Sequence, residues 1–286
     1  MFEKVNPSHP DKVADRMAGA IVDYAYTLRP NARVAVETLL GHGECHIIIE
    51  SSVDMDIRDI LSITDRLAPG MRAEPNVVPQ DIILASNQSD ILRCGDNGIF
   101  KGVPVTWEQR RLTNIAADIY RKYPYDGKYI IDVSGRLARH DVYAVICQSH
   151  TDAEQDEALL HALREKGVQA VINPLGPWTG GPDVDCGATN RKLGSDMGDA
   201  VTGGGLHGKD LSKADVSVNI VCHLLAQHYQ SVVTTRCAIG DEKLVFRVGT
   251  GHNITLSFPE TVERAREYII SIGGFEKFAA WGLIRP

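Results

Sequence analysis

The sequence of 286 residues lacks any C-x-x-C pair, although it contains six cysteines, at positions 45, 94, 147, 186, 222 and 237. Their scatter predicts reduced thiols and excludes a disulfide framework or a zinc site of the usual spacing. No stretch approaches the roughly 20 apolar residues of a membrane span. The N-terminus, MFEKVNPSHPDK, lacks the apolar core of a signal peptide. We therefore expect a cytoplasmic protein that does not bind a membrane.

An excess of basic charge is also missing. The chain has 30 Lys and Arg against 37 Asp and Glu, which gives a formal net charge of -7. This balance excludes nucleic-acid binding through overall charge and leaves a local basic pocket open. With 43% hydrophobic residues, the chain is long enough for two or three units with cores of their own.

Helical and β-branched segments recur in a similar order at a spacing of about 100 residues. The first pass predicts a helix over 10–28, strands over 33–40 and 44–52, a helix over 56–68 and a strand over 81–86. The second predicts a helix over 107–122, strands over 128–133 and 139–148, a helix over 152–166 and a strand over 168–173. The third predicts a helix over 212–229, strands over 231–239, 243–250 and 253–258, and a helix over 259–272. This pattern predicts an α+β fold of three similar units, each a mainly antiparallel sheet covered by helices.

The approximate unit boundaries follow from the same pattern. We expect one unit to combine residues 1–12, an N-terminal active-site segment, with residues 107–175. A second unit covers residues 13–106 and includes a Gly-Asp loop. The third unit covers residues 176–286 and includes the glycine-rich segment discussed next.

The segment Gly203–Asp215, GGGLHGKDLSKAD, combines glycines with lysines and carboxylates. Glycines allow backbone N–H groups to approach a ligand, lysines attract phosphate, and carboxylates can hold a divalent cation. The segment also satisfies both the dinucleotide motif G-x-G-x-x-G and the P-loop motif G-x-x-x-x-G-K. The first needs a preceding strand, but SDMGDAVT is polar; the second needs Ser or Thr where Asp210 stands. We favour a polyphosphate site of another kind over a flexible surface loop.

Other short segments supply matching chemistry. His9, Asp11 and the following lysine mark a helix start, where free N–H groups favour an anion. Two further loops carry Asp96 and Asp126-Gly127-Lys128, and each alone is more typical of an ordinary turn than of a site. The block GGPDVDCGATNRK adds Asp185 and the adjacent cations Arg191 and Lys192. Glu37 and Glu50 are carboxylates within strand-like runs, where strand alternation can also point them at solvent.

In this combination the residues resemble the methionine adenosyltransferases, also called S-adenosylmethionine synthetases. NPSHPDKVAD is similar to the family motif S-E-G-H-P-D-K-I-A-D, and CGDNG to G-A-G-D-Q-G. INPLGPWTGGPDVDCGATNRK is similar to N-P-T-G…G-G-P…D-C-G-L-T-G-R-K. GGGLHGKDLSKAD resembles G-G-G-A-F-S-G-K-D-P-S-K-V-D with one residue missing. Four blocks in the right order make the resemblance specific, and it implies three similar domains in a pseudo-threefold arrangement.

The resemblance also implies a reaction and its site residues. The methionine sulfur would attack the ribose C5′ of ATP, and the released triphosphate would be hydrolysed to pyrophosphate and phosphate. Catalytic roles fall to His9, Lys128, Lys209 and Arg191. ATP contacts fall to His9, Asp126, Lys128, Trp178, Asp185, Arg191, Lys192 and Lys209. Methionine contacts fall to Glu50, Gln88, Asp96, Asp185 and Lys213. Asp11 and Asp215 would hold Mg²⁺, two ions in all, and Glu37 would hold K⁺.

A homodimer, or a dimer of dimers, with active sites between subunits is implied as well. The chain departs from the motifs at Arg93-Cys94 and at His207, and it is contracted between Gln88 and Gly95. Two alternatives therefore stay open. One is an adenosyltransferase that uses another sulfur substrate. The other is a non-catalytic nucleotide-binding partner of a true synthetase, although the retained cations and metal acids favour catalysis.

Overall fold

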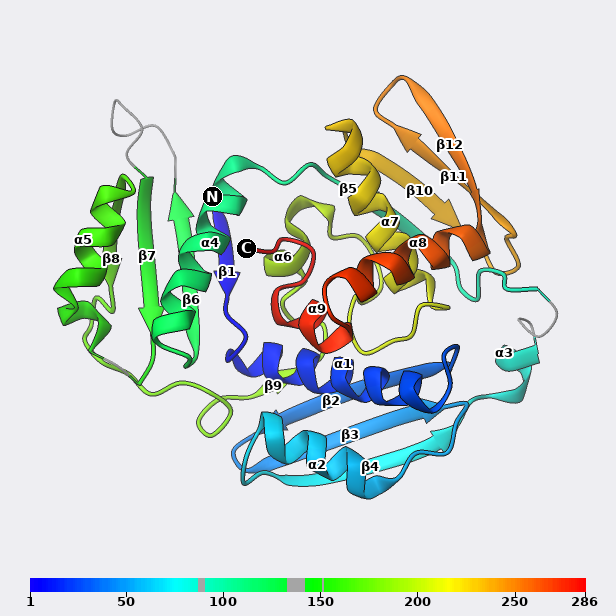
Figure 1. The fold of residues 1–286 in the computed structure, drawn as a ribbon, viewed down its shortest axis with the longest axis horizontal. Coiled ribbons are helices and arrows are strands. Elements are labelled where there is room, and N and C mark those ends of the chain that lie inside the picture. Colours follow the sequence, from blue (N-terminus) through cyan, green and yellow to red (C-terminus); the bar gives the residue numbers. More distant parts are fainter. Residues whose placement is uncertain (87–90, 133–141, 151) are drawn as a thin grey trace.

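A computed structural model describes residues 1–86, 91–132, 142–150 and 152–286. Within these residues three four-stranded sheets form, and Figure 1 shows them on the outside of the molecule around a central group of helices. The chain is an α+β protein of three similar units in pseudo-threefold arrangement, as the sequence predicted. Among the described residues no helix combines the length and apolar character needed to cross a bilayer.

The first sheet has the order β4-β3-β2-β9, with β2 (Val34–Gly41), β3 (Glu44–Ser51), β4 (Arg72–Pro79) and β9 (Gly187–Ala188). Helices α1 (Pro10–Leu28) and α2 (Ile57–Leu67) belong to this unit. The predicted hairpin and both helices are confirmed. The predicted strand over 81–86 is wrong, because α3 (Ile82–Ser86) occupies it and Asp81 Oδ1 accepts the Ile83 amide at 2.9 Å. The missed strand β4 contains two prolines, which an edge strand tolerates.

The second sheet has the order β1-β6-β7-β8, with β1 (Phe2–Val5), β6 (Gly127–Asp132), β7 (Val142–Gln148) and β8 (Val168–Ile172). Helices α4 (Trp107–Lys122) and α5 (Glu157–Glu165) belong to it, with the 3-10 turn η1 (Ala153–Gln155) before α5. In both of these sheets the hairpin is antiparallel, and the strand after the second helix joins it in parallel. The turn expected between the predicted strands 128–133 and 139–148, which contains Gly135, lies outside the described residues.

The third sheet has the order β12-β11-β10-β5, with β5 (Gly98–Gly102), β10 (Val233–Cys237), β11 (Lys243–Val248) and β12 (His252–Ser257). It is antiparallel throughout. Helices α7 (Ala214–Tyr229) and α8 (Phe258–Ser271) accompany it, and both were predicted. The short helices α6 (Leu193–Met197), η2 (Gly198–Ala200) and α9 (Phe275–Trp281) were not.

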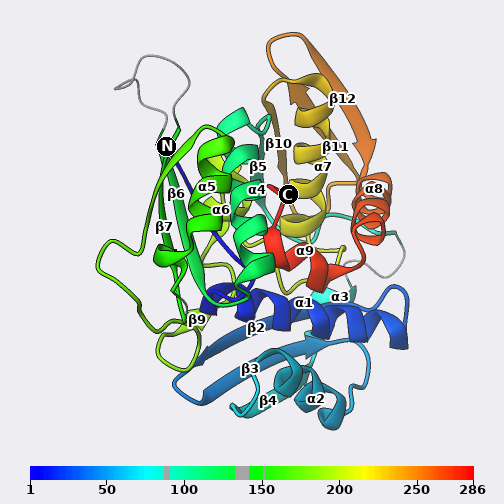
Figure 2. The same cartoon turned by 60° about the vertical axis from the view of Figure 1, so that its left-hand side comes forward.

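The strands do not follow the sequence order of the three units. β1 pairs with β6 across more than 120 residues, β5 pairs with β10, and β9 pairs with β2. The domain boundaries given above stay a prediction; β5 lies within the expected range 13–106 but belongs to the third sheet. In Figure 2, turned by 60°, α1, α4, α7 and α9 again lie between the sheets. The segments that enter this centre carry the predicted site residues.

Candidate active site

The start of α1 gathers one set of predicted site residues. Pro10 occupies the first turn, where its missing N–H costs no hydrogen bond, and His9 caps the helix by accepting the Asp11 amide at Nδ1 (3.2 Å). Since Nδ1 is an acceptor, the proton of the neutral ring lies on Nε2. Burial, and then the charge of Lys192, lower the pKa of His9 to about 4. At neutral pH, His9 is therefore an uncharged ring that can donate a hydrogen bond from Nε2.

Asp11 is a buried carboxylate with three partners. Its Oδ1 accepts the Ala188 amide at 2.9 Å and lies 3.5 Å from Arg191 Nε, and its Oδ2 lies 2.9 Å from Lys192 Nζ. Strand β9 approaches this closely because of Gly187, where a Cβ would lie 2.2 Å from backbone at the start of α1. We call the four predicted site residues that meet here the α1 cluster: His9, Asp11, Arg191 and Lys192.

Asp126, Trp178 and Asp185 border the α1 cluster. Asp126 is buried before β6 and accepts the Gly181 amide at 2.9 Å through Oδ2; burial raises its pKa to about 6. Its Oδ1 is also buried and has no hydrogen-bond partner among the described residues. Trp178 lies against the same turn, since a Cβ at Gly180 would be 2.5 Å from its ring. Asp185 is exposed. Its negative charge partly opposes the lowering of the His9 pKa and adds to the rise of the Asp126 pKa.

Lys128 lies on the same side of the molecule. It is half-exposed on β6, and its Nζ lies 3.2 Å from Glu3 Oε2 on the neighbouring strand β1. Its charge contributes to the lowered pKa of His9. The predicted ATP-binding residues, Lys209 apart, are thus brought together around the start of α1.

The glycine segment lies along the free part of the β2 edge. Val36 donates its amide to the Gly208 carbonyl at 2.6 Å, and Asp210 donates its own to the Val34 carbonyl at 2.9 Å. Gly208 has φ +78°, and a Cβ there would lie 2.2 Å from the Val36 carbonyl oxygen, so only glycine fits. Asp210 is buried and accepts the amides of Val34 (2.8 Å) and Ser212 (2.7 Å). Asp210 thus closes this turn through its carboxylate. This explains why an acid follows Lys209, at the position where a P-loop has Ser or Thr.

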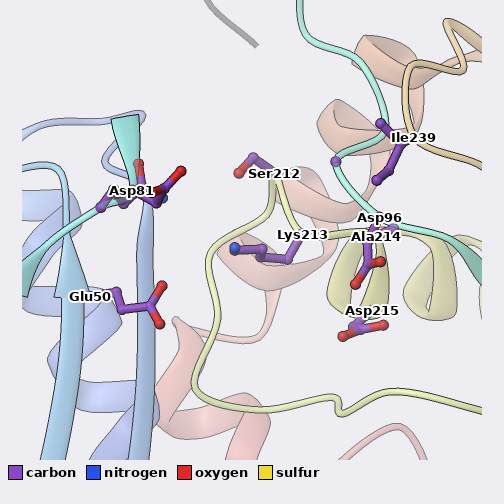
Figure 3. A pocket seen from close by; sticks show the side chains of 10 residues that line it. Glu50, Asp81, Asp96, Ser212, Lys213, Ala214, Asp215 and Ile239 are labelled. Atoms are coloured by element: carbon purple, nitrogen blue, oxygen red, sulfur yellow. The ribbon is translucent and has the colours of Figure 1, made fainter. Parts of the chain in front are cut away.

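A second set of predicted residues surrounds a cavity of about 220 Å³ beside this segment. Figure 3 shows Glu50 from β3 on one side, Asp96 and Asp215 on the other, and Lys213 between them. Lys209, at the end of the glycine segment, pairs with Asp215 (Nζ to Oδ2, 2.9 Å). We call the following residues the glycine cluster: Glu50, Asp96, Lys209, Lys213 and Asp215.

Glu37, the predicted potassium ligand, belongs beside the glycine cluster. Partial burial raises its pKa, and the neighbouring Lys209 opposes that rise. Gln88, predicted to contact methionine, lies outside the described residues. Asp185, predicted for the same group, lies near the α1 cluster and not with Glu50, Asp96 and Lys213.

The two predicted magnesium ligands, Asp11 and Asp215, lie in different clusters. Both oxygens of Asp11 already contact protein N–H groups or cations, whereas Asp215 Oδ1 has no hydrogen-bond partner among the described residues. In Figure 3 the carboxylates of Asp96 and Asp215 are turned toward each other. Oxygen ligands of this kind suit Mg²⁺. Asp215 therefore has one carboxylate oxygen that could bind a divalent cation, with Lys209 beside the other oxygen, and Asp11 could bind one only when a cation beside it moves.

Buried ionic residues lie beneath both clusters, and only Lys12 among them was noted from the sequence, as a cation at the helix start. Lys12, Asp15 and Asp196 are each 1% exposed or less. Lys12 Nζ lies 2.6 Å from Asp196 Oδ2 and 3.1 Å from Asp15 Oδ2. The available signal was two charges three residues apart on the apolar face of α1, which points to a buried pair.

Comparisons with known proteins identify relatives in sequence and in fold. The sequence model of the S-adenosylmethionine synthetase N-terminal domain matches residues 1–66. S-adenosylmethionine synthases from Nitratidesulfovibrio vulgaris and Thermus thermophilus are 26% and 27% identical, over 99% and 89% of this chain and 88% and 80% of theirs. The enzyme from Myxococcus xanthus is 30% identical over 75% of this chain and 66% of its own length.

A solved structure and a second sequence model complete the comparison. The structure of an unusual S-adenosylmethionine synthetase from Campylobacter jejuni superposes with a TM-score of 0.75 at 19% identity, covering 99% of this chain and 94% of that one. The model of the DNA circularisation protein N-terminus matches residues 95–181, a range that begins in the third sheet and continues through the second. The fold defines a class of three-unit α+β proteins. Within it, the chain belongs to the S-adenosylmethionine synthetase family as a short, divergent member.

Proposed function

We propose that this protein synthesises S-adenosylmethionine from ATP and methionine. The observation that carries the proposal is the division of charge between the two clusters. The α1 cluster has two cations and one carboxylate, with a neutral histidine donor. The glycine cluster has three carboxylates and two lysines around a cavity. The first suits a triphosphate, and the second suits cations and the charged ends of an amino acid.

The chemistry needs these groups and no base. A thioether sulfur is a neutral nucleophile, so the barrier falls through alignment of the reactants and stabilisation of the departing triphosphate. His9 Nε2–H would donate to the triphosphate near the C5′ oxygen. Arg191, Lys192 and Lys128, together with Lys209 from the glycine cluster, would take up the charge of the departing triphosphate. Asp126, Trp178 and Asp185 would orient the nucleoside.

Mg²⁺ and K⁺ are part of the proposal. Mg²⁺, when bound, neutralises phosphate oxygens; Asp215 and Asp11 would hold it, with Asp96 beside the first. Glu37 would hold K⁺, and its partly buried carboxylate beside Lys209 would then be charge-balanced. Glu50, Asp96 and Lys213 would bind the amino and carboxylate groups of methionine.

A homodimer with sites between subunits would bring the clusters together. The cavity of about 220 Å³ is lined by the glycine cluster, Lys209 apart, and by no residue of the α1 cluster. It is smaller than the roughly 300–1,000 Å³ usual for ligand sites, so ATP and methionine need a further wall. Outward-facing apolar side chains on all three sheets support a self-complementary interface, among them Leu39, Ile48, Ile99, Ile130 and Val245. The α1 cluster of one copy would then face the glycine cluster of its partner.

Mass spectrometry of the products tests the function. With ATP, Mg²⁺ and K⁺, we expect S-adenosylmethionine, pyrophosphate and phosphate to form only when methionine is added. A product from a methionine analogue in place of methionine would instead favour another sulfur substrate. Nucleotide binding without turnover would favour a non-catalytic partner. Formation of ADP, or release of phosphate independent of methionine, would contradict the proposed function.

A further inference from the structure

Asn190 adopts a left-handed backbone conformation that glycine usually occupies. Its φ is +64°, and it immediately precedes Arg191 and Lys192 of the α1 cluster. The motif quoted above, D-C-G-L-T-G-R-K, has glycine at this place. Asparagine tolerates this conformation better than most residues, at a cost relative to glycine. A contact made by its side chain must therefore offset this conformational cost.

That contact is with the glycine segment, 15 to 17 residues further along. Asn190 Oδ1 accepts two consecutive amides, from Leu206 at 2.7 Å and His207 at 2.9 Å. Its Nδ2 donates to the His207 carbonyl at 3.2 Å. The fit leaves no room for a side chain at Gly205, where a Cβ would lie 2.7 Å from Asn190 Nδ2. One side chain thus holds the segment that ends in Lys209.

The contact belongs to a closed ring of buried polar groups. Asp15 Oδ1 accepts the Asn190 amide (2.8 Å), and His207 Nε2 lies 2.8 Å from Asp196 Oδ2. Asp196 contacts Lys12 Nζ, which contacts Asp15 again (2.6 and 3.1 Å). The ring joins α1, the loop after β9, α6 and the glycine segment. His207, where the sequence departs from the family motif, is the member that the glycine segment contributes.

This ring is not a metal centre. Asp15, Asp196 and His207 bring ligand atoms within 4.8 Å of one another. The Lys12 ammonium, however, already lies against both carboxylates, at the distances given above. A divalent ion there would add two charges beside a buried lysine, which is unfavourable without its deprotonation.

We propose that Asn190 is the positioning residue that holds the segment carrying Lys209 against the loop that carries Arg191 and Lys192, so that Lys209 is presented to its site in a fixed position. It acts through the backbone of His207, two residues before Lys209, while its own neighbours bind Asp11. Only the expected effect on catalysis rests on the proposed function. The hydrogen bonds by which Asn190 holds the glycine segment do not depend on the reaction.

The test compares Asn190→Gly with Gln230→Gly. Both remove a side chain from a left-handed position, and Gln230 ends α7, where its side chain bonds only to its own helix. In Asn190→Gly we expect amide hydrogen exchange of residues 205–209 to accelerate by at least about tenfold, because two amides lose their acceptor. In the Gln230 variant this peptide should exchange as in the wild type. Wild-type exchange in both variants would overturn the proposal.

Kinetics supply the readout of positioning. A displacement of Lys209 by about 1 Å can cost about 100-fold in rate, so kcat of Asn190→Gly should fall by about 10- to 100-fold with KM for ATP changed less than about threefold. Asn190→Asp keeps the acceptor and loses the donor, so it should restore part of both exchange protection and kcat. It also serves if the glycine variant fails to fold. Faster exchange with unchanged kcat would overturn the positioning role; an inactive wild type would reject the proposed function while leaving the exchange result intact.

Discussion

The α1 cluster and the glycine cluster are built in opposite ways. In the first, Asp11 is 1% exposed and each of its oxygens has a partner, and His9 is held neutral by burial and a neighbouring cation. In the second, three carboxylates and Lys213 line an open cavity, and an oxygen of Asp215 is unpaired among the described residues. The comparison shows that the α1 cluster is preorganised to bind an anion, whereas the glycine cluster needs added cations to balance its carboxylates. Four changes, from the largest expected effect to the smallest, test that contrast.

The first change fixes the loop that brings Asp96 to the glycine cluster. Cys94 and Cys237 are buried, and their sulfur atoms lie 2.8 Å apart. Hydrogen bonding from Cys237 lowers the pKa of Cys94, which favours the thiolate that attacks a disulfide. Exchange with oxidised glutathione should therefore form one intramolecular disulfide and release two glutathione thiols. Because this bond would close a loop spanning 143 residues, it should raise the free energy of unfolding by about 4 kcal/mol.

Mass spectrometry of the cross-linked peptides and urea unfolding measure this effect. Cys94→Ser should abolish the cross-link, and Cys147→Ser, a half-buried cysteine elsewhere, should leave it in place. Mixed disulfides with glutathione, and no intramolecular bond, would show that the loop is not held against β10 as the structure has it.

The second change removes the cation of the glycine segment. Lys209→Ala should raise the activation barrier by about 3 kcal/mol, or about 100-fold in kcat, as for one oxyanion-hole donor. KM should change little, because the charge matters most as the triphosphate departs. Steady-state kinetics measure both constants, and Lys277→Ala, at an exposed residue of α9, is the control. A kcat within twofold of the wild type would remove the proposed role.

The same variant tests whether the clusters meet across a dimer. If each site takes one cluster from each copy, mixed dimers of Lys209→Ala and Lys192→Ala contain one intact site and one doubly altered site. After co-refolding of equal amounts, activity should recover to about a quarter of wild type, since half of the dimers are mixed. Recovery absent from a confirmed mixed dimer would place both clusters of a site in one chain.

The third change concerns a carboxylate beside the α1 cluster. Burial raises the pKa of Asp126 from 3.8 to about 6. Between these values the native state keeps a proton that the unfolded chain has lost, so the free energy of unfolding falls as the pH rises through this window. Asp126→Asn removes that cost and should stabilise the protein by about 2 kcal/mol at pH 7.5, and by almost nothing at pH 3.5. Asp183→Asn, exposed in the same loop, should have no such effect.

Urea unfolding at both pH values measures the difference, and the ATP affinity of Asp126→Asn shows what the charge contributes to binding. A gain in stability with weaker ATP binding is the expected combination, because a group retained at a stability cost is typical of functional sites. Equal destabilisation at both pH values would instead show that Asp126 only holds the turn at Gly181.

Much of this arrangement could be predicted from the sequence, and the limits have physical causes. Helices such as 107–122 were predicted to the residue because their apolar period is intrinsic to the segment. Strands β4 and β9 were missed since one contains two prolines and the other has two residues that pair only through β2. The motifs also identified site residues one by one. Their division into two clusters depends on contacts such as Asp11 with Ala188, 177 residues apart, which no local pattern contains.

The smallest effect is expected at the edge of the α1 cluster. Glu3 and Lys128 form an ion pair at 3.2 Å, with both side chains 43% exposed. Water and salt screen such a pair, so Glu3→Gln should change the free energy of unfolding by less than about 0.5 kcal/mol. It frees Lys128 for the triphosphate, and KM for ATP should fall by about twofold at most. Urea unfolding at low and high salt, with ATP kinetics, measures both. A loss of more than about 1.5 kcal/mol, insensitive to salt, would show that Lys128 is fixed as firmly as Lys192, and the preorganised cluster would then extend to β6.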